Sequence, residues 1–485
     1  MSIRNLEPSA LWNHFADLNA VPRPSKKEER VIQFMVDFGQ SLGLETKTDK
    51  IGNVIVKKPA TPGMESRETL IMQSHIDMVH QKNSDTNFDF ETQGIEMFVD
   101  GDWVKAKGTT LGADNGIGVA AIMALLSSKD IPHPALEAMF TIDEETGMTG
   151  AKELEGANFS GKILLNLDTE DDDELSIGCA GGIDTNTNYA YQEVNVKEGS
   201  VFKEIKLKGL LGGHSGMDIH LGRGNANKLL NRFLYHFHSL SDFQLISFDG
   251  GSLRNAIPRE AKAVLAIDKE QTQWLNEELN NYMSILKSEY GTIEPAFSME
   301  ISDASGAEKA VHMDDFHKIV NTIYAVQNGV FRMSPDIEGL VEASSSLARV
   351  IVADGKFITQ SLQRSSVESS KGDVANTIRA AFESMGCAVV QTGDYPGWAP
   401  DPNSRILNLM TGLYQKMYKE EPKVKACHAG LECGILGKHL PGVEMISFGP
   451  NIRGAHSPDE KVQISSVQKF WSYLLATLEN TPSRS

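Results

Sequence analysis

The amino-acid sequence predicts an α/β fold: a mixed, mostly parallel sheet flanked by helices, with a second, α+β domain inserted into the first. Three observations lead to this class. Short apolar runs bounded by polar residues alternate with helical segments in the first part of the chain. From about Tyr191 the pattern changes to strands that alternate apolar and charged residues. After the breaker-rich segment that begins at Tyr395, helix and strand resume. We therefore expect residues 1–188 and 393–485 to form the first domain and residues 189–392 the insert.

The first domain should contain strands that are buried on both faces. The runs that predict them are short, apolar and bounded by polar residues, at 53–58, 70–77, 135–142, 162–167 and 443–448. Residues 115–127 fit a helix that is apolar nearly all round and therefore buried. Ser25 and Glu28 have the spacing of a capping box ahead of another helix, for which Gly43 supplies a C-terminal stop.

The insert combines antiparallel strands with amphipathic helices. Residues 201–208 alternate apolar and charged side chains, which is typical of a strand with one face in water. The pair Asp354-Gly355 between two strand-like runs predicts a two-residue hairpin. Helical periodicity predicts helices at 226–239, 271–288, 316–326 and 373–385.

Charge and cysteine content narrow the class of protein. The chain has 485 residues and a formal net charge of −19, which repels phosphate and argues against a nucleic-acid partner. Four cysteines without a CxxC pair suggest a reducing compartment. The N-terminal segment lacks the pattern of a signal peptide, and the longest apolar run, 117–126, is too short to span a bilayer. We expect a cytoplasmic protein that binds neither nucleic acid nor membrane.

Side chains that can bind metal occur where the apolar runs end. His75 and Asp77 close one run at positions i and i+2, so both should point to one face of the strand. Glu144 and Glu145 follow the next run, and Asp168 follows another. Because ligands of open α/β sheets bind beyond the carboxyl ends of the strands, we expect these groups to line one site.

Two further candidates lie in loops. Asp114 stands between Gly112 and Gly116, just ahead of a helix, and His456 follows an apolar run. Taken singly, an Asp in this position is usually a helix cap, and a lone His is usually an ordinary surface or core residue. The joint pattern is more informative, because two histidines and three carboxylates all follow apolar segments.

This set of residues suits a pair of divalent ions. Zinc accepts histidine nitrogen and carboxylate oxygen, and a catalytic site keeps one position open for water. Two zinc ions about 3.5–4 Å apart can share a carboxylate and a hydroxide. Two zinc ions, three carboxylates and one hydroxide sum to zero charge, which a partly dry site favours. Glu144 can then act as general base for the water, and Asp77 can orient the His75 imidazole. The same ligands also accept manganese or cobalt.

At these residues the sequence resembles the zinc-dependent M20 metallopeptidase family. Five blocks occur in the order of that family: Ser74-His75-Ile-Asp77-Met, Gly112-Ala-Asp114-Asn115-Gly116, Asp143-Glu144-Glu145-Thr-Gly147, Leu167-Asp168-Thr and His456-Ser-Pro-Asp459. Further segments, 107–118, 209–216, 253–259 and 428–434, resemble the branch of the family that hydrolyses Xaa-His dipeptides. The similarity covers nearly the whole chain.

The resemblance implies a role for each matching ligand. Asp114 matches a carboxylate that bridges two zinc ions and is followed by a cis peptide bond. The other matched ligands are His75 and Asp168 for one zinc, and Glu145 and His456 for the second.

The resemblance also implies Glu144 as the general base and Asp77 as the carboxylate that orients a histidine ligand. The insert matches a lid domain, in which His214 matches a residue that stabilises the oxyanion, often supplied by the partner subunit of a homodimer. Asn255 and Arg364 match lid groups that hold the terminal carboxylate of the substrate. From the residues alone, His214 fits an ordinary turn and Arg364 a surface ion pair equally well.

We therefore expect a metallodipeptidase that hydrolyses short unblocked dipeptides, preferentially Xaa-His, and that forms a homodimer. Two alternatives stay open. One is another hydrolase of the same family, a tripeptidase or an amidase acting on N-acyl amino acids, because specificity depends on pocket shape. The other is a metal-binding scaffold without turnover, against which an intact Glu144 beside Glu145 argues.

Overall fold

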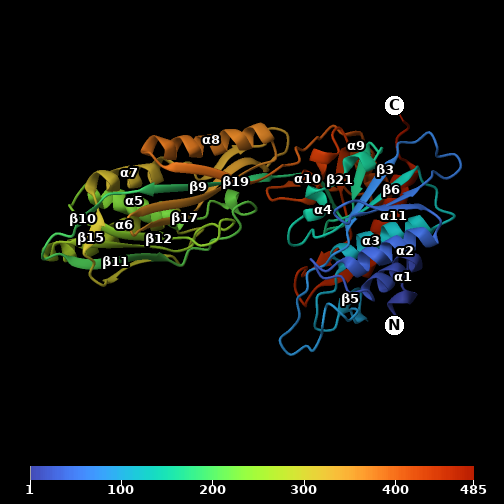
Figure 1. The fold of residues 1–485 in the computed structure, drawn as a ribbon, viewed down its shortest axis with the longest axis horizontal. Helices are drawn as coiled ribbons and strands as arrows, with labels where there is room; N and C mark the ends of the chain where they lie inside the picture. Colours follow the sequence, from blue (N-terminus) through green and yellow to red (C-terminus); the bar gives the residue numbers. More distant parts are fainter. Residues whose placement is uncertain (1, 485) are drawn as a thin grey trace. The chain divides into compact units, whose positions relative to one another are not determined.

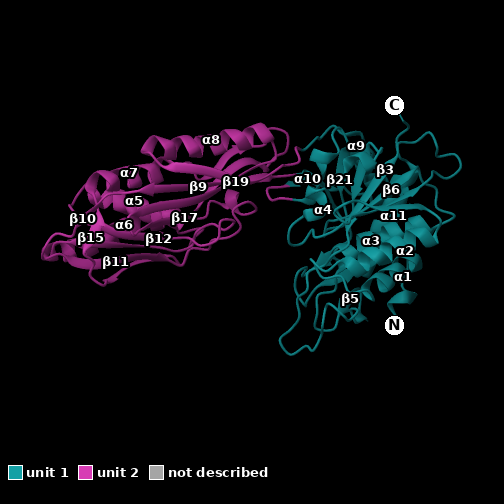
Figure 2. Cartoon of the chain, viewed as in Figure 1, with its two compact units in different colours: residues 1–178, 400–426, 431–485 teal, residues 179–399, 427–430 magenta. Residues whose placement is uncertain are grey.

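The structure is a computed structural model and describes residues 2–484. The chain forms two compact units, coloured separately in Figure 2, and each is described by itself. Unit 1 consists of Met1–Gly178, Pro400–Ala426 and Leu431–Ser485, and unit 2 of Cys179–Ala399 and Cys427–Gly430.

The boundaries expected from the sequence lie inside strands of unit 2. Residue 188 falls within β9 (Gly181–Ala190) and residue 392 within β19 (Ala388–Tyr395). These two strands pair with each other, antiparallel, in the sheet of unit 2. Unit 2 therefore begins before the first expected boundary, at Cys179, and its long segment ends after the second, at Ala399.

Unit 1 is built on an eight-stranded mixed sheet with the order β1-β2-β6-β3-β7-β21-β8-β20. These strands are β1 (Glu45–Thr48), β2 (Val54–Lys58), β6 (Leu136–Thr141), β3 (Leu70–His75), β7 (Ile163–Asn166), β21 (Glu444–Ser447), β8 (Glu174–Cys179) and β20 (Lys423–Cys427). Neighbours β6, β3, β7 and β21 run parallel, and every residue of β3, β6 and β7 is buried. This confirms the predicted fold class and the predicted burial of the runs that form β3, β6 and β7. Strands β2 and β21 are buried over only part of their length.

Helices surround this sheet, as Figure 1 shows. They are α1 (Ser9–Asn19), α2 (Glu29–Ser41), α3 (Ala113–Ser127), the short α4 (Thr149–Lys152), α9 (Arg405–Tyr418), α10 (Glu432–His439) and α11 (Ile464–Glu479). The apolar helix α3 is buried along its length and packs against both β3 and α1. It therefore forms part of the core, as its composition predicted.

The capping box predicted before α2 is wrong. The helix begins at Glu29, and its N-cap residue Glu28 makes no side-chain cap bond. Ser25 instead donates its hydroxyl to Oδ2 of Asp77 at 2.7 Å, and the Glu28 carboxylate accepts the backbone N–H of Lys26 at 2.9 Å. The hydroxyl of Ser25, which local spacing predicted to cap the helix, instead bonds to the buried carboxylate of Asp77.

Close packing of α3 against the sheet depends on Gly118. A Cβ atom there would lie 2.5 Å from Oγ of Ser74 and 2.7 Å from the carbonyl oxygen of Leu167. We expect Gly118→Ala to lower the free energy of unfolding by about 2 kcal/mol, because overpacking outweighs the better helix propensity of Ala. The matched control is Gly412→Ala in α9, where no atom lies within 4 Å of the added Cβ. Urea denaturation should show the control unchanged or more stable, and equal midpoints for both variants would contradict the packing argument.

Unit 2 contains a nine-stranded sheet with the order β14-β11-β13-β12-β17-β18-β9-β19, to which β16 adds by pairing with β17. Its remaining strands are β14 (Ser298–Asp303), β11 (Val201–Lys208), β13 (Ala261–Ile267), β12 (Gln244–Gly250), β17 (Val341–Ala353), β18 (Lys356–Ser365) and β16 (Gly329–Met333). Helices α5 (Ala226–His238), α6 (Thr272–Tyr290), α7 (Met313–Ala325) and α8 (Glu368–Met385) accompany it. The predicted hairpin is confirmed: β17 and β18 pair antiparallel, with Asp354 and Gly355 both at positive φ between them.

Candidate functional site

Parallel strands of unit 1 bring the predicted site residues to one edge of the sheet. His75 is the last residue of β3, and the segments after β6 and β7 carry Glu144 and Asp168. These three strands are neighbours and run in the same direction, so their carboxyl ends meet. Asp114 lies at the start of α3, before a cis peptide bond to the next residue. The cis bond is the one that the family resemblance implied.

The fifth candidate, His456, comes from a small four-stranded sheet with the order β22-β23-β5-β4. Its strands are β22 (Ile452–Arg453), β23 (Lys461–Gln463), β5 (Trp103–Ala106) and β4 (Met97–Asp100). His456 lies in the loop between β22 and β23, with positive φ. This loop places a residue from near the C-terminus beside residues of the first half of the chain.

Two groups of three potential ligands share Asp114. In the first group, Nε2 of His75 lies 3.2 Å from Oδ1 of Asp114 and 3.8 Å from Oδ1 of Asp168. In the second, Nε2 of His456 lies 3.4 Å from Oδ2 of Asp114 and 3.0 Å from Oε2 of Glu145. Within each group the potential ligand atoms all lie within 4.8 Å of one another. The structure thus brings together all five residues that the sequence nominated as ligands, and one carboxylate belongs to both groups.

Asp77 holds the surroundings of this cluster in place. Its Oδ1 lies 3.3 Å from Nδ1 of His75 and accepts the backbone N–H of Glu144 at 3.1 Å. Its Oδ2 accepts the hydroxyl of Ser25 and, at 3.3 Å, the backbone N–H of Glu145. One buried carboxylate therefore connects the histidine at the end of β3 with the pair of acids after β6.

The charges in the cluster perturb one another. Burial raises the pKa of Glu144 to about 8, and the nearby carboxylates of Glu432 and Glu145 reinforce the shift. Burial also raises the pKa of Asp168 well above its usual value. For Asp114, hydrogen bonds from the two histidines outweigh the effect of burial and hold the pKa well below its usual range. So many carboxylates in one buried place are unfavourable without cations.

The donor set fits a pair of zinc ions. It consists of imidazole nitrogen and carboxylate oxygen, which zinc prefers. Oε1 of Glu145 is buried and has no hydrogen-bond partner among residues 2–484. A buried carboxylate oxygen without a donor is costly unless a cation binds there, so this orphaned atom supports a metal near Glu145.

Two functional neighbours were not found from the sequence. Glu460 accepts four backbone N–H groups, those of residues 111 to 114, at 2.7–3.2 Å. Arg23 is 1% exposed and donates to the carbonyl oxygens of Ile76, Asp77 and Gly112. Both residues therefore fix the backbone around the cluster. Glu460 follows His456 by four residues, which is a weak signal, and nothing in the sequence marks Arg23.

A third group of acids, Glu28, Asp77 and Asp143, also lies close together. Here donors from the protein already occupy the oxygens: Lys26, Thr146 and Thr149 bond to the Asp143 carboxylate. The hydrogen bonds described above occupy both oxygens of Asp77. We assign no metal to this group.

The predicted lid residues lie in unit 2. Nδ1 of His214 accepts the backbone N–H groups of Gly216 and Met217, at 3.1 and 2.9 Å, so the ring proton is on Nε2. Burial, reinforced by Arg364, lowers the pKa of His214 and favours this neutral form. A neutral ring with its proton on Nε2 is a hydrogen-bond donor, as stabilisation of an oxyanion requires.

Arg364 is buried, contrary to the surface alternative, and Asn255 is exposed. The Arg364 guanidinium donates to the hydroxyl of Tyr395 at 2.9 Å, while its Nε has no partner. In the part of the chain that the structure describes, no carboxylate lies within ion-pair distance of Arg364. The Asp184 carboxylate acts on Arg364 only from beyond ion-pair distance and is itself paired with Arg254. A buried cation without a direct ion pair suits a carboxylate that arrives with a ligand.

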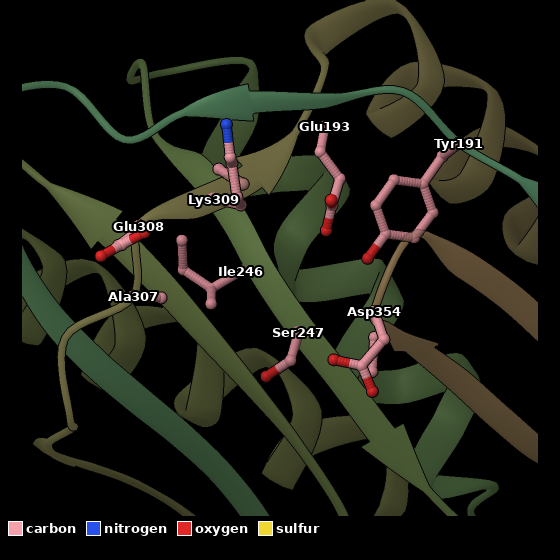
Figure 3. Close-up of a pocket in the computed structure, with 10 residues that line it drawn as sticks. Tyr191, Glu193, Ile246, Ser247, Ala307, Glu308, Lys309 and Asp354 are labelled. Atoms are coloured by element: carbon pink, nitrogen blue, oxygen red, sulfur yellow. The ribbon is translucent and has the colours of Figure 1, made fainter.

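Unit 2 also contains a hollow of about 340 Å³ beside the β17–β18 hairpin (Figure 3). Acidic and basic side chains line it together, among them Glu193, Glu308 and Lys309. None of the predicted site residues lines this hollow. It therefore plays no part in the site described here.

Comparison with known proteins agrees with this geometry. The peptidase dimerisation domain of M20 enzymes matches residues 205–294. The chain is 40% identical over 482 residues to the cytosol non-specific dipeptidase of Escherichia coli (strain K12), with 99% of each chain covered. The chain therefore belongs to the M20 peptidase family.

Solved structures give the same result. The crystal structure of aminoacylhistidine dipeptidase from Vibrio alginolyticus matches with a TM-score of 0.97 and 43% identity, over 100% of this chain and 99% of that one. The aminopeptidase PepT from Bacillus cereus ATCC 10987 shares the fold, with a TM-score of 0.54, 16% identity and 98% of both chains covered. No helix within residues 2–484 is long and apolar enough to cross a membrane.

Proposed function

We propose that the protein is a dizinc dipeptidase that hydrolyses short unblocked dipeptides, preferentially Xaa-His. The observation that carries the proposal is the sharing of Asp114 by the two groups, one around His75 and one around His456. The names of the similar proteins, a cytosol non-specific dipeptidase and an aminoacylhistidine dipeptidase, support the substrate class.

Residues of unit 1 would bind the metal ions and transfer the proton. Two bound zinc ions, held by the five residues named above, would supply Lewis acidity and make water more acidic. Glu144 takes the proton of the attacking water and passes it to the leaving amine. Asp77 keeps the His75 imidazole oriented, and its hydrogen bonds to the backbone hold Glu144 in place.

Unit 2 would recognise the substrate. His214 would donate a hydrogen bond from its Nε2–H to the oxyanion that forms at the scissile carbonyl. Arg364 binds the terminal carboxylate in two-point fashion, assisted by Asn255. These groups would recognise a free carboxylate, which a dipeptide carries one residue from the cleaved bond and an internal segment of a protein chain does not.

We also propose that the protein is a homodimer in the cytoplasm. The match of residues 205–294 to a peptidase dimerisation domain supports the first statement. The name of the Escherichia coli relative supports the second. The four cysteines without a CxxC pair also support a reducing compartment such as the cytoplasm.

Chelation tests the metal requirement and the substrate class together. Removal of divalent ions should abolish hydrolysis of Ala-His, and re-addition of zinc should restore it, because the base alone cannot activate water sufficiently. The panel should include a tripeptide and an N-acetyl amino acid alongside Ala-His. Turnover that survives complete chelation would contradict the metal mechanism. A faster reaction with the tripeptide or the N-acetyl compound would favour the corresponding alternative activity.

A further inference from the structure

Glu432 is a buried carboxylate of unit 1 without a positive partner. It is the first residue of α10 and is 2% exposed. Its Oε2 accepts the side-chain amide of Gln73 at 2.6 Å, and the Thr141 hydroxyl also bonds to the carboxylate. Its Oε1 is buried and has no hydrogen-bond partner, and no Lys, Arg or His of residues 2–484 lies within ion-pair distance.

The position of Glu432 ties it to the metal cluster. Its partner Gln73 lies two residues before His75 on β3, so the two side chains point to the same face of the strand. Its other partner, Thr141, is the residue of β6 that pairs with His75 in the sheet. The charge of Glu432 is close enough to contribute to the raised pKa values of Glu144 and Asp168. Glu432 therefore belongs to the same edge of the sheet, although it is in neither group of potential metal ligands.

Glu432 is one more acid than the potential metal ligands account for. Two divalent ions and a hydroxide would balance Asp114, Glu145 and Asp168. Of the other acids, Asp77 accepts hydrogen bonds at both oxygens and Glu144 is the proposed base, whereas Glu432 keeps one oxygen without a donor. The N-terminal end of α10 offsets only part of a full negative charge. Burial, reinforced by the Asp77 carboxylate and opposed by His75, raises the pKa of Glu432 to about 7. A cation that binds with the ligand would supply the missing charge.

We propose that Glu432 receives the α-ammonium group of the substrate and so selects peptides with a free N-terminus. The inference rests on the proposed dipeptidase function. In a dipeptide the ammonium group stands one carbon from the scissile carbonyl, so a carboxylate at the same edge of the sheet as the metal cluster is the group positioned to bind it. An N-acylated substrate has no charge to offer and would leave the Glu432 anion buried and unpaired.

The test compares two ligands that differ only in the ammonium group, Ala-His and its des-amino analogue propionyl-histidine. Both are titrated by calorimetry into zinc-loaded Glu144→Gln protein, which should not consume them, and into the Glu144→Gln/Glu432→Gln double variant. We expect Glu432→Gln to weaken Ala-His binding about 30-fold or more and to change propionyl-histidine binding less than about threefold. An equal effect on both ligands, or unchanged Ala-His binding, would overturn the proposal.

The control is Glu137→Gln, which makes the same change in a buried carboxylate of the same sheet. Glu137 is 4% exposed and is paired with Lys57 at 2.9 Å. In the same Glu144→Gln background, this variant should bind both ligands as the parent does. Zinc content and thermal midpoints identify any misfolded variant, and Glu432→Asp, which keeps the charge, should retain part of the preference for Ala-His.

Activity of the wild-type protein on Ala-His tests the dipeptidase function separately. If the wild-type protein does not cleave Ala-His, the proposed reaction is overturned. The ammonium site still stands in that case if Glu432→Gln removes the preference for Ala-His over propionyl-histidine. If the wild-type protein cleaves Ala-His, and the Glu432→Gln variant still prefers Ala-His over propionyl-histidine, only the ammonium site is overturned.

Discussion

Glu144→Gln is expected to lower kcat on Ala-His by about three orders of magnitude while zinc content stays near that of the wild type. Glutamine keeps the size of the side chain but cannot accept a proton from the attacking water. Glu144 belongs to neither group of potential ligands, so its charge is not needed to hold the ions. Its main-chain N–H bond to Asp77 does not depend on the side chain and should persist. Steady-state kinetics together with metal analysis of the same preparation measure both quantities.

The matched control is Glu153→Gln, an exposed glutamate in the same region of the chain, which should leave kcat unchanged. Unchanged turnover of Glu144→Gln would remove Glu144 from the role of base. Loss of zinc in parallel with activity would instead place this residue among the ligands.

The convergence of the site was predictable because it follows from sheet geometry. His75 and Asp168 end or follow apolar runs, and the structure shows those runs as adjacent parallel strands. Once the runs are read as parallel strands, the carboxyl ends must meet at one edge. Asp114 and His456 were nominated from the joint pattern of residues next to apolar segments, and the family resemblance assigned each of them as a ligand, since no local pattern shows which loops meet in the fold.

Residues whose role depends on tertiary contacts alone were missed or misread. Glu460 binds the backbone of a loop nearly 350 residues earlier in the chain, a contact that no spacing rule contains. Ser25 has the spacing of a helix cap, yet it bonds to Asp77 from another segment. The burial of Arg364 was equally hidden, because a strand of alternating pattern does not reveal what covers its end.

Asp114→Asn is expected to weaken binding of both zinc ions, each by at least about 100-fold, and to abolish turnover. The reason is geometric: one oxygen of Asp114 faces the His75 group and the other faces the His456 group. Asparagine preserves the shape of the side chain but removes its charge and turns one of the two oxygens into a donor. Titration of the metal-free protein with zinc against a chromophoric chelator measures the two affinities.

Asp168→Asn is the comparison variant. It removes a carboxylate that belongs to one ligand group, whereas Asp114→Asn removes the carboxylate that belongs to both. Asp168 contacts only the group around His75, so its replacement should weaken one equivalent of zinc and leave the other close to its wild-type affinity. A bridging carboxylate requires that Asp114→Asn weakens the binding of two equivalents of zinc and that Asp168→Asn weakens the binding of one. If both variants lose a single equivalent, the two groups bind their ions independently and Asp114 is not the link between them. The neutral charge balance inferred for the site would then fail with it, because that balance counts the Asp114 charge once for the pair of ions.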